Sequence, residues 1–295
     1  MDVDALGMVE QVRIGEHTLT MTLPVLGDTM GLLQAPSGYP GGPLPPHMVE
    51  AFEHRWGYRS SERVYYVTAA AASVLLWPEE EMYDSEEFTN LSKAFFPWFK
   101  AAQEWASVWA GMPLGDFDNS HESALHIPDG GRYITGSPAR MRTLFVPKQP
   151  LSRAQVSGAL RRASRGEHLP VEHQMLLSAE DAQLGGDLRK AVIDAATAAE
   201  VALASYVADH LRKKDLASEF IDEMIKDVNG VANLHVLCTR LGGEPGVSKN
   251  RLTTELADIR NKAAHGGKIP TSREAIVAGK HAVTIVRALR PLPQV

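Results

Sequence analysis

Apolar side chains recur every three or four residues in two segments of the second half of the chain, and this spacing predicts amphipathic helices. One apolar stripe consists of Leu252, Leu256, Ile259 and Ala263, and the other of Val192, Ala196, Ala199 and Leu203. The start of the chain differs, because VEQVRI and TLTMTL alternate on either side of the turn GEH. That alternation predicts a β-hairpin, so the chain begins with a sheet and ends with helices.

The segments between these regions predict a mixed domain. ERVYYVTAAAASVLLW indicates one or two buried strands, and a further strand pair is expected between residues 124 and 146. A helix between them carries an aromatic-rich seam, which consists of Phe88, Leu91, Phe95, Trp98, Ala102, Trp105 and Trp109. Such a seam more often fills the core of its own domain than it binds another chain or a ligand, and Pro97 is expected to kink the helix.

Two domains are expected, because 295 residues exceed the usual size of one domain. Residues 1–150 are expected to form an α+β domain with a regulatory or sensing role. Residues 151–295 are expected to form an all-α helical bundle, whose first helix begins near Ser152. The fold class is therefore an α+β domain followed by a helical domain.

The ends of the helix that carries Leu252 are marked in the sequence. Ser248 is placed to cap its beginning, and Gly266 and Gly267 are placed to end it in a left-handed turn. Thr271 and Glu274 predict a capping box at the start of the next helix. Two helices are therefore expected to meet at the glycine pair.

The segment IRNKAAHGG, residues 259–267, places an arginine and a histidine just before that junction. The guanidinium of Arg260 can hold a phosphate with two hydrogen bonds, and the imidazole of His265 can move a proton near neutral pH. Spacing alone is weak evidence, since Arg162 and His168 also satisfy it. Gly166 interrupts that earlier pair and predicts a loop rather than a helix end.

Helical geometry limits how Arg260 and His265 can cooperate. At about 100° per residue, Arg260 lies at the edge of the buried stripe, while Asn261 and His265 lie on the outer face. On a straight helix the two side chains diverge by roughly 140° and are roughly 7.5 Å apart along the axis. A shared site therefore needs either fraying at the glycines or a second copy of the helix across a two-fold axis, and we favour the second copy.

This region resembles the HEPN family of helical domains. The resemblance rests on IRNKAAHGG, on the following PTSREAIVAGKHAVTIVRAL and on the preceding GGDLRKAVIDAATAAEVALASYVADHL, and it covers Leu169 to Leu292. In that family an arginine, usually followed by a polar residue, precedes a histidine by four to six intervening residues; here four lie between Arg260 and His265. The resemblance implies metal-independent ribonuclease activity at a dimer interface, although other members are noncatalytic or bind nucleotides.

Carried over to this sequence, the resemblance gives each residue a role. Arg260 would stabilise the anionic phosphorane, and His265 would act as general base on the ribose 2′-hydroxyl or as general acid on the leaving oxygen. Asn261 would orient one of them, or it is simply a polar residue on a solvated face. Glu200 lies beside the stripe of the other signature helix and could reach the site, or it is a boundary carboxylate paired with a lysine or arginine. No cofactor and no metal are expected.

Charge is distributed unevenly along the chain, whose net charge is −6. Residues 1–150 carry 10 basic and 19 acidic side chains, whereas residues 151–295 carry 20 and 17. Five cations near the motif are candidates for RNA contact, and these are Lys249, Arg251, Lys262, Lys268 and Arg273. An ordinary lysine-rich solvated surface is the alternative.

Several other classes of protein lack their signatures here. The single Cys238 allows no internal disulfide and is expected to be a buried core thiol. His168 and His173 do not have the H-E-x-x-H spacing of a zinc site, and neither a Walker motif nor a G-x-S-x-G elbow occurs. No apolar run of transmembrane length and no signal peptide is recognised, so a cytoplasmic location is expected.

The sequence therefore favours a HEPN-type endoribonuclease that works without a metal. A toxin or an antiviral defence effector would fit, with the acidic N-terminal domain governing the nuclease. The expected partners are an RNA substrate and a second copy of the chain but no membrane, and whether an antitoxin or other regulatory protein exists stays open. The alternative is a noncatalytic dimeric protein that binds RNA or a nucleotide.

Overall fold

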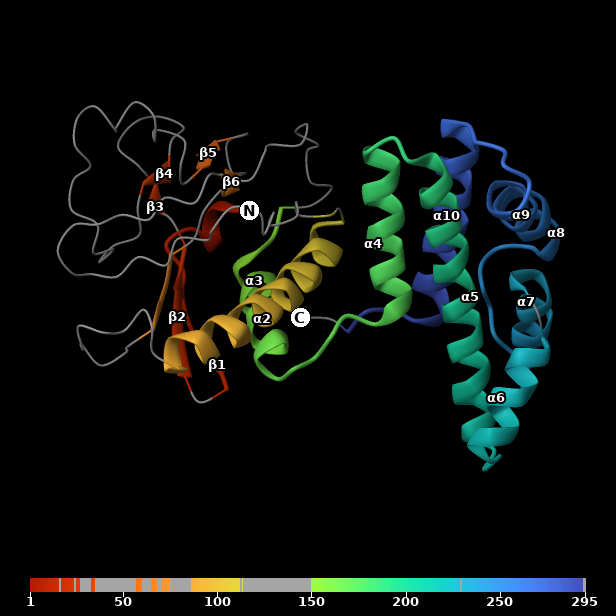
Figure 1. Ribbon diagram of the computed structural model, residues 1–295, viewed down its shortest axis with the longest axis horizontal. Coiled ribbons are helices and arrows are strands. Elements are labelled where there is room, and N and C mark those ends of the chain that lie inside the picture. The colour runs from red at the N-terminus through yellow and green to blue at the C-terminus, as the bar shows by residue number, and fades with distance from the viewer. Residues whose placement is uncertain are drawn as a thin grey trace. The chain divides into compact units, whose positions relative to one another are not determined.

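The computed structural model describes residues 1–15, 17–23, 25–26, 33–34, 57–59, 65–67, 71–74, 86–111, 113, 150–228 and 230–293. The chain divides into two compact units, Met1–His168 (unit 1) and Leu169–Gln294 (unit 2). An antiparallel sheet lies near the N-terminus, and most of the described remainder is helical (Figure 1). The strand pair expected between residues 124 and 146 lies outside the described residues.

The predicted hairpin is confirmed at the start of unit 1. Strands β1 (Val9–Ile14) and β2 (His17–Thr22) pair in antiparallel register, and β7 (Ala71–Val74) pairs with the other edge of β2. Two short strand pairs accompany this sheet: β3 (Val25–Leu26) with β4 (Leu33–Gln34), and β5 (Gly57–Arg59) with β6 (Tyr65–Val67). A 3-10 turn, η1 (Val3–Ala5), precedes β1.

The described side chains of the aromatic seam, from Phe95 to Trp109, pack in the core of unit 1. The seam lies on α2 (Glu86–Ala110), which contains Pro97 and packs on α3 (Arg153–Ser164) and on β1. Trp98 and Trp105 are buried, and each indole N–H has a partner, because Trp98 Nε1 donates to Ser164 Oγ (3.0 Å) and Trp105 Nε1 donates to the Glu167 carbonyl (2.9 Å). This part of the seam therefore packs within its own unit, as expected, whereas the side chains of Phe88 and Leu91 lie outside the described residues.

The domain boundary is later than the expected one at 150/151. Helix α3 begins near Ser152 as predicted, with a capping box between Ser152 and Gln155. Its apolar face, however, buries Val156 and Leu160 in the core that α2 and the sheet share. The first helix of the expected helical domain therefore belongs to unit 1, and the units divide at 168/169.

Unit 2 is built around one long central helix. Its helices are α4 (Val171–Leu184), α5 (Leu188–Arg212), α6 (Ser218–Asp227), α7 (Val231–Arg240), α8 (Lys249–Leu252), α9 (Asp258–Ala264) and α10 (Ser272–Leu289), and a π-helical turn, η3 (Thr253–Ala257), joins α8 to α9. Helices α4 and α10 pack on one side of α5, and α6, α7 and α9 pack on the other (Figure 1).

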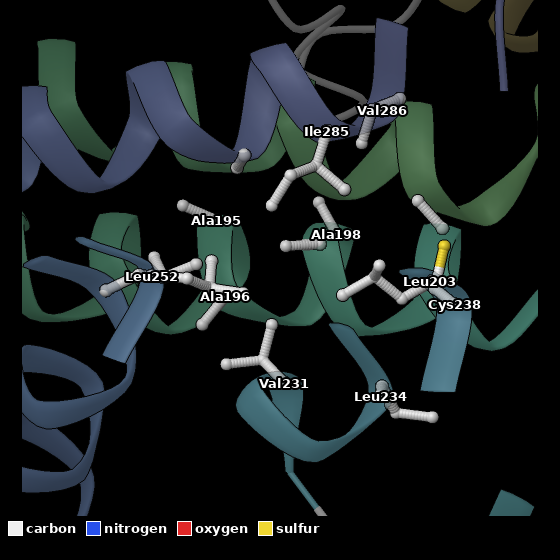
Figure 2. Close-up of a cluster of buried hydrophobic side chains, with 14 of the residues drawn as sticks. Ala195, Ala196, Ala198, Leu203, Val231, Leu234, Cys238, Leu252, Ile285 and Val286 are labelled. Carbon is white, nitrogen blue, oxygen red and sulfur yellow. The ribbon is translucent and has the colours of Figure 1, made fainter. Parts of the chain in front are cut away.

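Alanine side chains line several faces of α5, and these faces are buried against neighbouring helices. Ile285 and Val286 of α10 point toward Ala195 and Ala198, and Val231 of α7 packs below the same helix (Figure 2). Small side chains let the backbones of neighbouring helices approach closely, so the core of unit 2 is densely packed. Within the described ranges, α5 is the one helix long and apolar enough to span a membrane, and 56% of its most apolar window is buried in the unit.

A polar cluster ties the end of α10 to α4 and α5. Arg290 donates from Nε to Glu172 (3.0 Å) and from Nη1 to Asp209 (2.5 Å), and its carbonyl is bonded to His173 Nε2 (2.8 Å). Glu172 and His173 are buried, so the guanidinium and the carbonyl satisfy groups that are shielded from water. His173 is therefore a structural residue of this helical unit.

Candidate functional site

The helix that carries the Arg260 motif is anchored by its apolar stripe. Leu252, Leu256 and Ala263 are fully buried, and Ile259 packs against the same core, as the spacing predicts. The helix is not regular throughout, because the turn η3 has π geometry. Ser248 occupies the predicted N-cap position, but its side chain accepts no capping hydrogen bond. π turns often occur close to functional sites.

The end of this helix is set by the glycine pair. His265 is the C-cap residue, and Gly267 adopts a φ of +66°, which favours glycine. The Lys268 N–H donates to the Lys262 carbonyl at 3.2 Å and closes the turn. A Cβ at Gly266 would lie 2.9 Å from that same carbonyl oxygen. Both glycines are therefore required, and the predicted capping box of Thr271 and Glu274 begins α10.

Arg260 is half-buried and its charge has no carboxylate partner in the described chain. Its Nη1 donates to Asn261 Oδ1 at 3.2 Å. Its Nε is shielded from solvent and has no hydrogen-bond partner among the described residues. An unpaired donor in this position is costly, so an added acceptor, such as a phosphate oxygen, would stabilise a guanidinium that turned toward it.

His265 is exposed at the end of the same helix. Its backbone N–H donates to the Asn261 carbonyl at 2.9 Å, so Asn261 contacts Arg260 through its side chain and His265 through its backbone. Among the described contacts, no hydrogen bond joins the Arg260 side chain to the His265 side chain. Within one chain, Asn261 therefore links the two residues without a described contact between their side chains.

Arg189, which the sequence analysis did not single out, lies at the same helix end. Its Nη2 donates to the Ala264 carbonyl at 3.2 Å, and its side chain is exposed. The sequence offered one signal, which is the position of Arg189 in the first turn of α5. The helix dipole disfavours a cation there, so a contact outside α5 is expected for its side chain. Sequence spacing could not reveal the partner, which is 75 residues away.

Glu200 is not brought to the motif by the described contacts. It is half-buried on α5, eleven residues after Arg189, which corresponds to about 16 Å of helical rise. In the described part of the chain it forms no hydrogen bond or ion pair, so the expected lysine or arginine partner is not present there either.

The five candidate RNA-contacting cations are all exposed. Lys268 differs from the others because its Nζ donates to Glu274 Oε1 at 2.8 Å. Hydrogen bonds from Lys268 and from Thr271 lower the pKa of Glu274 to about 2. The charge of Lys268 is thus largely neutralised, whereas Lys262 and Arg273 form no ion pair with a described residue.

Cys238 is a buried core thiol, as predicted. Burial raises its pKa to about 11, which suppresses the reactive thiolate. Its neighbour on α7, His235, is bonded through Nε2 to the Val247 carbonyl at 2.7 Å. Across the ranges that the structure describes, no group of three or more histidine, cysteine, aspartate or glutamate side chains could hold a metal ion.

Comparison of the chain with protein-family models, with curated proteins and with solved structures finds no match.

Proposed function

We propose that the chain is an endoribonuclease of HEPN type that cleaves RNA as a homodimer and needs no metal. The observation that carries the proposal is the state of Arg260: a half-buried guanidinium, held by Asn261 and without a carboxylate partner in the described chain, just before an exposed histidine. A guanidinium without a carboxylate partner keeps its charge and its donors for an external anion.

The reaction would transfer the phosphoryl group from the 5′-oxygen of the next nucleotide to the ribose 2′-oxygen beside it. His265 removes the proton from the ribose 2′-hydroxyl, the 2′-oxygen attacks the adjacent phosphorus, and the bond to the 5′-oxygen breaks when that oxygen receives a proton. Arg260 stabilises the extra negative charge on the phosphorane. The products are a 2′,3′-cyclic phosphate and a free 5′-hydroxyl. In the proposed dimer, the histidine of the second copy supplies the second proton transfer.

Unit 1 is proposed to govern this activity, as would suit a toxin or an antiviral defence effector. The support is charge, since residues 1–168 hold 20 acidic and 14 basic side chains whereas residues 169–295 hold 16 of each. An acidic unit repels RNA and so lowers the local RNA concentration around the candidate site. A chain that begins at Leu169 is then expected to cleave RNA faster than the full chain.

The direct test is cleavage of total RNA in the presence of a chelator, with fragment ends analysed for cyclic phosphate. His265→Ala should lower cleavage by about 10²- to 10⁴-fold. His168→Ala is the matched control, because His168 is also exposed and also follows a helix that carries an arginine. Equal cleavage by the wild type and His265→Ala would reject the nuclease.

The second candidate is a dimeric protein that binds RNA or a nucleotide without turnover. It is favoured by one observation: the described contacts of a single chain bring neither Glu200 nor the Arg260 guanidinium into hydrogen-bond contact with His265. Such a protein would bind RNA and leave its ends unchanged, and the His265→Ala variant would bind it as well as the wild type does.

A further inference from the structure

A second arginine lies at the helix end that carries His265. Arg189 Nη2 is 3.2 Å from the oxygen of the peptide that joins Ala264 to His265. Standard backbone dimensions then place this nitrogen within about 6 Å of the His265 Cα. The contact joins α5 to the C-terminus of α9, which are neighbours in the core of unit 2.

The environment of Arg189 differs from that of the next residue. Lys190 is in contact with Asp194 and Ser178, so its charge is balanced within the unit. Arg189 forms no ion pair with a described residue, and in the described chain its side chain is hydrogen-bonded only to a backbone carbonyl. In the first turn of α5, where the helix dipole disfavours a cation, an unbalanced guanidinium has no stabilising role for its own helix.

The hydrogen bond to Ala264 uses only part of what the guanidinium offers. Arginine has five N–H donors, and the side chain of Arg189 is exposed. The remaining donors can hold a phosphate with two parallel hydrogen bonds beside the His265 imidazole. We propose that Arg189 is a second phosphate-binding arginine of the site, acting in the same chain as His265 on single-stranded RNA. This inference rests on the proposed function.

The proposal separates the tasks of the two arginines. Arg260 is half-buried and diverges from His265 on its own helix, so it meets the histidine of a second copy. Arg189 reaches the histidine of its own chain from a different helix. Arg189 would therefore hold the phosphate next to the imidazole of its own chain, before a second copy adds its Arg260.

A capping role for Arg189 is the competing explanation, and two substitutions distinguish it from phosphate binding. Arg189→Gln keeps an N–H donor for the Ala264 carbonyl but removes the charge, whereas Arg189→Lys keeps the charge. Lys213→Gln is the control, because Lys213 is an exposed cation at the opposite end of α5, about 36 Å away by helical rise. All three are made in the full chain that also carries His265→Ala, so that RNA is bound without being cut.

The measurement is the affinity for a single-stranded RNA oligonucleotide over a series of salt concentrations. Loss of one phosphate contact should reduce the salt slope by about 0.7 and weaken binding about tenfold in Arg189→Gln. Arg189→Lys should keep the slope, and Lys213→Gln should match the parent. Equal slopes in Arg189→Gln and the parent, or an equal loss in Lys213→Gln, would overturn the inference.

Failure of this inference can be told apart from failure of the nuclease. If the chain without substitutions cleaves RNA and Arg189→Gln binds like its parent, the inference fails and the nuclease stands. If the chain without substitutions does not cleave RNA, but Arg189→Gln is the one variant whose salt slope of RNA binding falls, the nuclease fails and the phosphate contact stands. If no RNA is bound, both fail.

Discussion

Arg162 with His168 and Arg260 with His265 are arginine–histidine pairs of similar spacing, and the structure gives them different environments. In unit 1, Arg162 Nη1 is bonded to Glu167 Oε2 at 2.6 Å, so its charge is neutralised. In unit 2, Arg260 has only the uncharged Asn261 as a hydrogen-bond partner among the described residues. An available charge, rather than spacing, therefore distinguishes a candidate anion site from a structural arginine.

Packing reinforces the difference. The Arg162 guanidinium carbon lies 4.7 Å from the centre of the Trp105 ring, so this cation stacks on an aromatic core residue. Arg162 also lies in the last turn of α3, not in the loop that the sequence indicated. It is therefore a structural residue of unit 1, which makes it the natural control for Arg260.

The turn glycines determine where each histidine lies. Gly166, with a φ of +70°, turns the chain two residues before His168, so that histidine lies beyond its helix. Gly267, with a φ of +66°, turns the chain two residues after His265, so that histidine remains on the helix as its C-cap. The His265 N–H donates to the Asn261 carbonyl within the helix, whereas in the first pair it is the Glu167 N–H, one residue before His168, that donates to the Arg162 carbonyl.

The largest expected effect comes from removing each guanidinium in turn. Arg260→Ala should lower the rate of RNA cleavage by about 10²- to 10³-fold, because it removes a donor to the phosphorane. Arg162→Ala should leave the rate unchanged and lower the thermal stability of unit 1, because Trp105 loses its stacked partner. Rates and melting curves of both variants test this. A similar loss of rate in both variants would remove the distinction between the two pairs.

A smaller effect is expected from exchanging the partners. Asn261→Asp would give Arg260 a carboxylate, as Glu167 does for Arg162, and should reduce cleavage about tenfold because the guanidinium is then occupied. Glu167→Gln frees Arg162 and should create no new cleavage activity. The comparison is of initial rates at matched protein concentration. Full activity of Asn261→Asp would show that the charge of Arg260 need not be free.

Much of the fold follows from local patterns in the sequence, whereas the site follows only in part. The hairpin, the aromatic seam and the capping box of Thr271 and Glu274 depend on residues two to four positions apart, so the sequence predicts them. The π turn η3 and the boundary at 168/169 depend on how apolar faces pack. The sequence shows that a face is apolar but not which element it packs against. The sequence therefore predicted elements better than their associations.

The same limit applies to the site. The pairing of Arg162 with Glu167 is within reach of sequence reasoning, because five residues separate them. The contact of Arg189 with Ala264 joins distant segments and needs coordinates. Glu200 lies beside an apolar stripe, as predicted. The stripe does not show, however, which turn of the helix lies next to the Arg260 motif.

Changing the turn glycines should have an effect of about 1 kcal/mol. Gly267→Ala puts a Cβ on a left-handed backbone and should destabilise unit 2 by about that amount, although no neighbouring atom would clash with it. Gly166→Ala should cost unit 1 a similar amount for the same reason. Only Gly267→Ala should also slow RNA cleavage, since it disturbs the turn after His265. Chemical denaturation and cleavage rates measured side by side provide the test.

The last effect concerns pH, because a loss of stability at low pH would also lower the measured cleavage rate. Burial lowers the pKa of His173 below its ordinary value of 6.5. As the pH falls through about 6.5, the unfolded chain therefore takes up a proton that the folded chain resists, and unit 2 loses stability. His173→Gln keeps a donor for the Arg290 carbonyl and removes this titration, so its stability should fall less between about pH 7 and pH 5. Parallel stability curves for the wild type and His173→Gln would contradict this. A loss of cleavage that persists in His173→Gln would belong to the site rather than to unfolding.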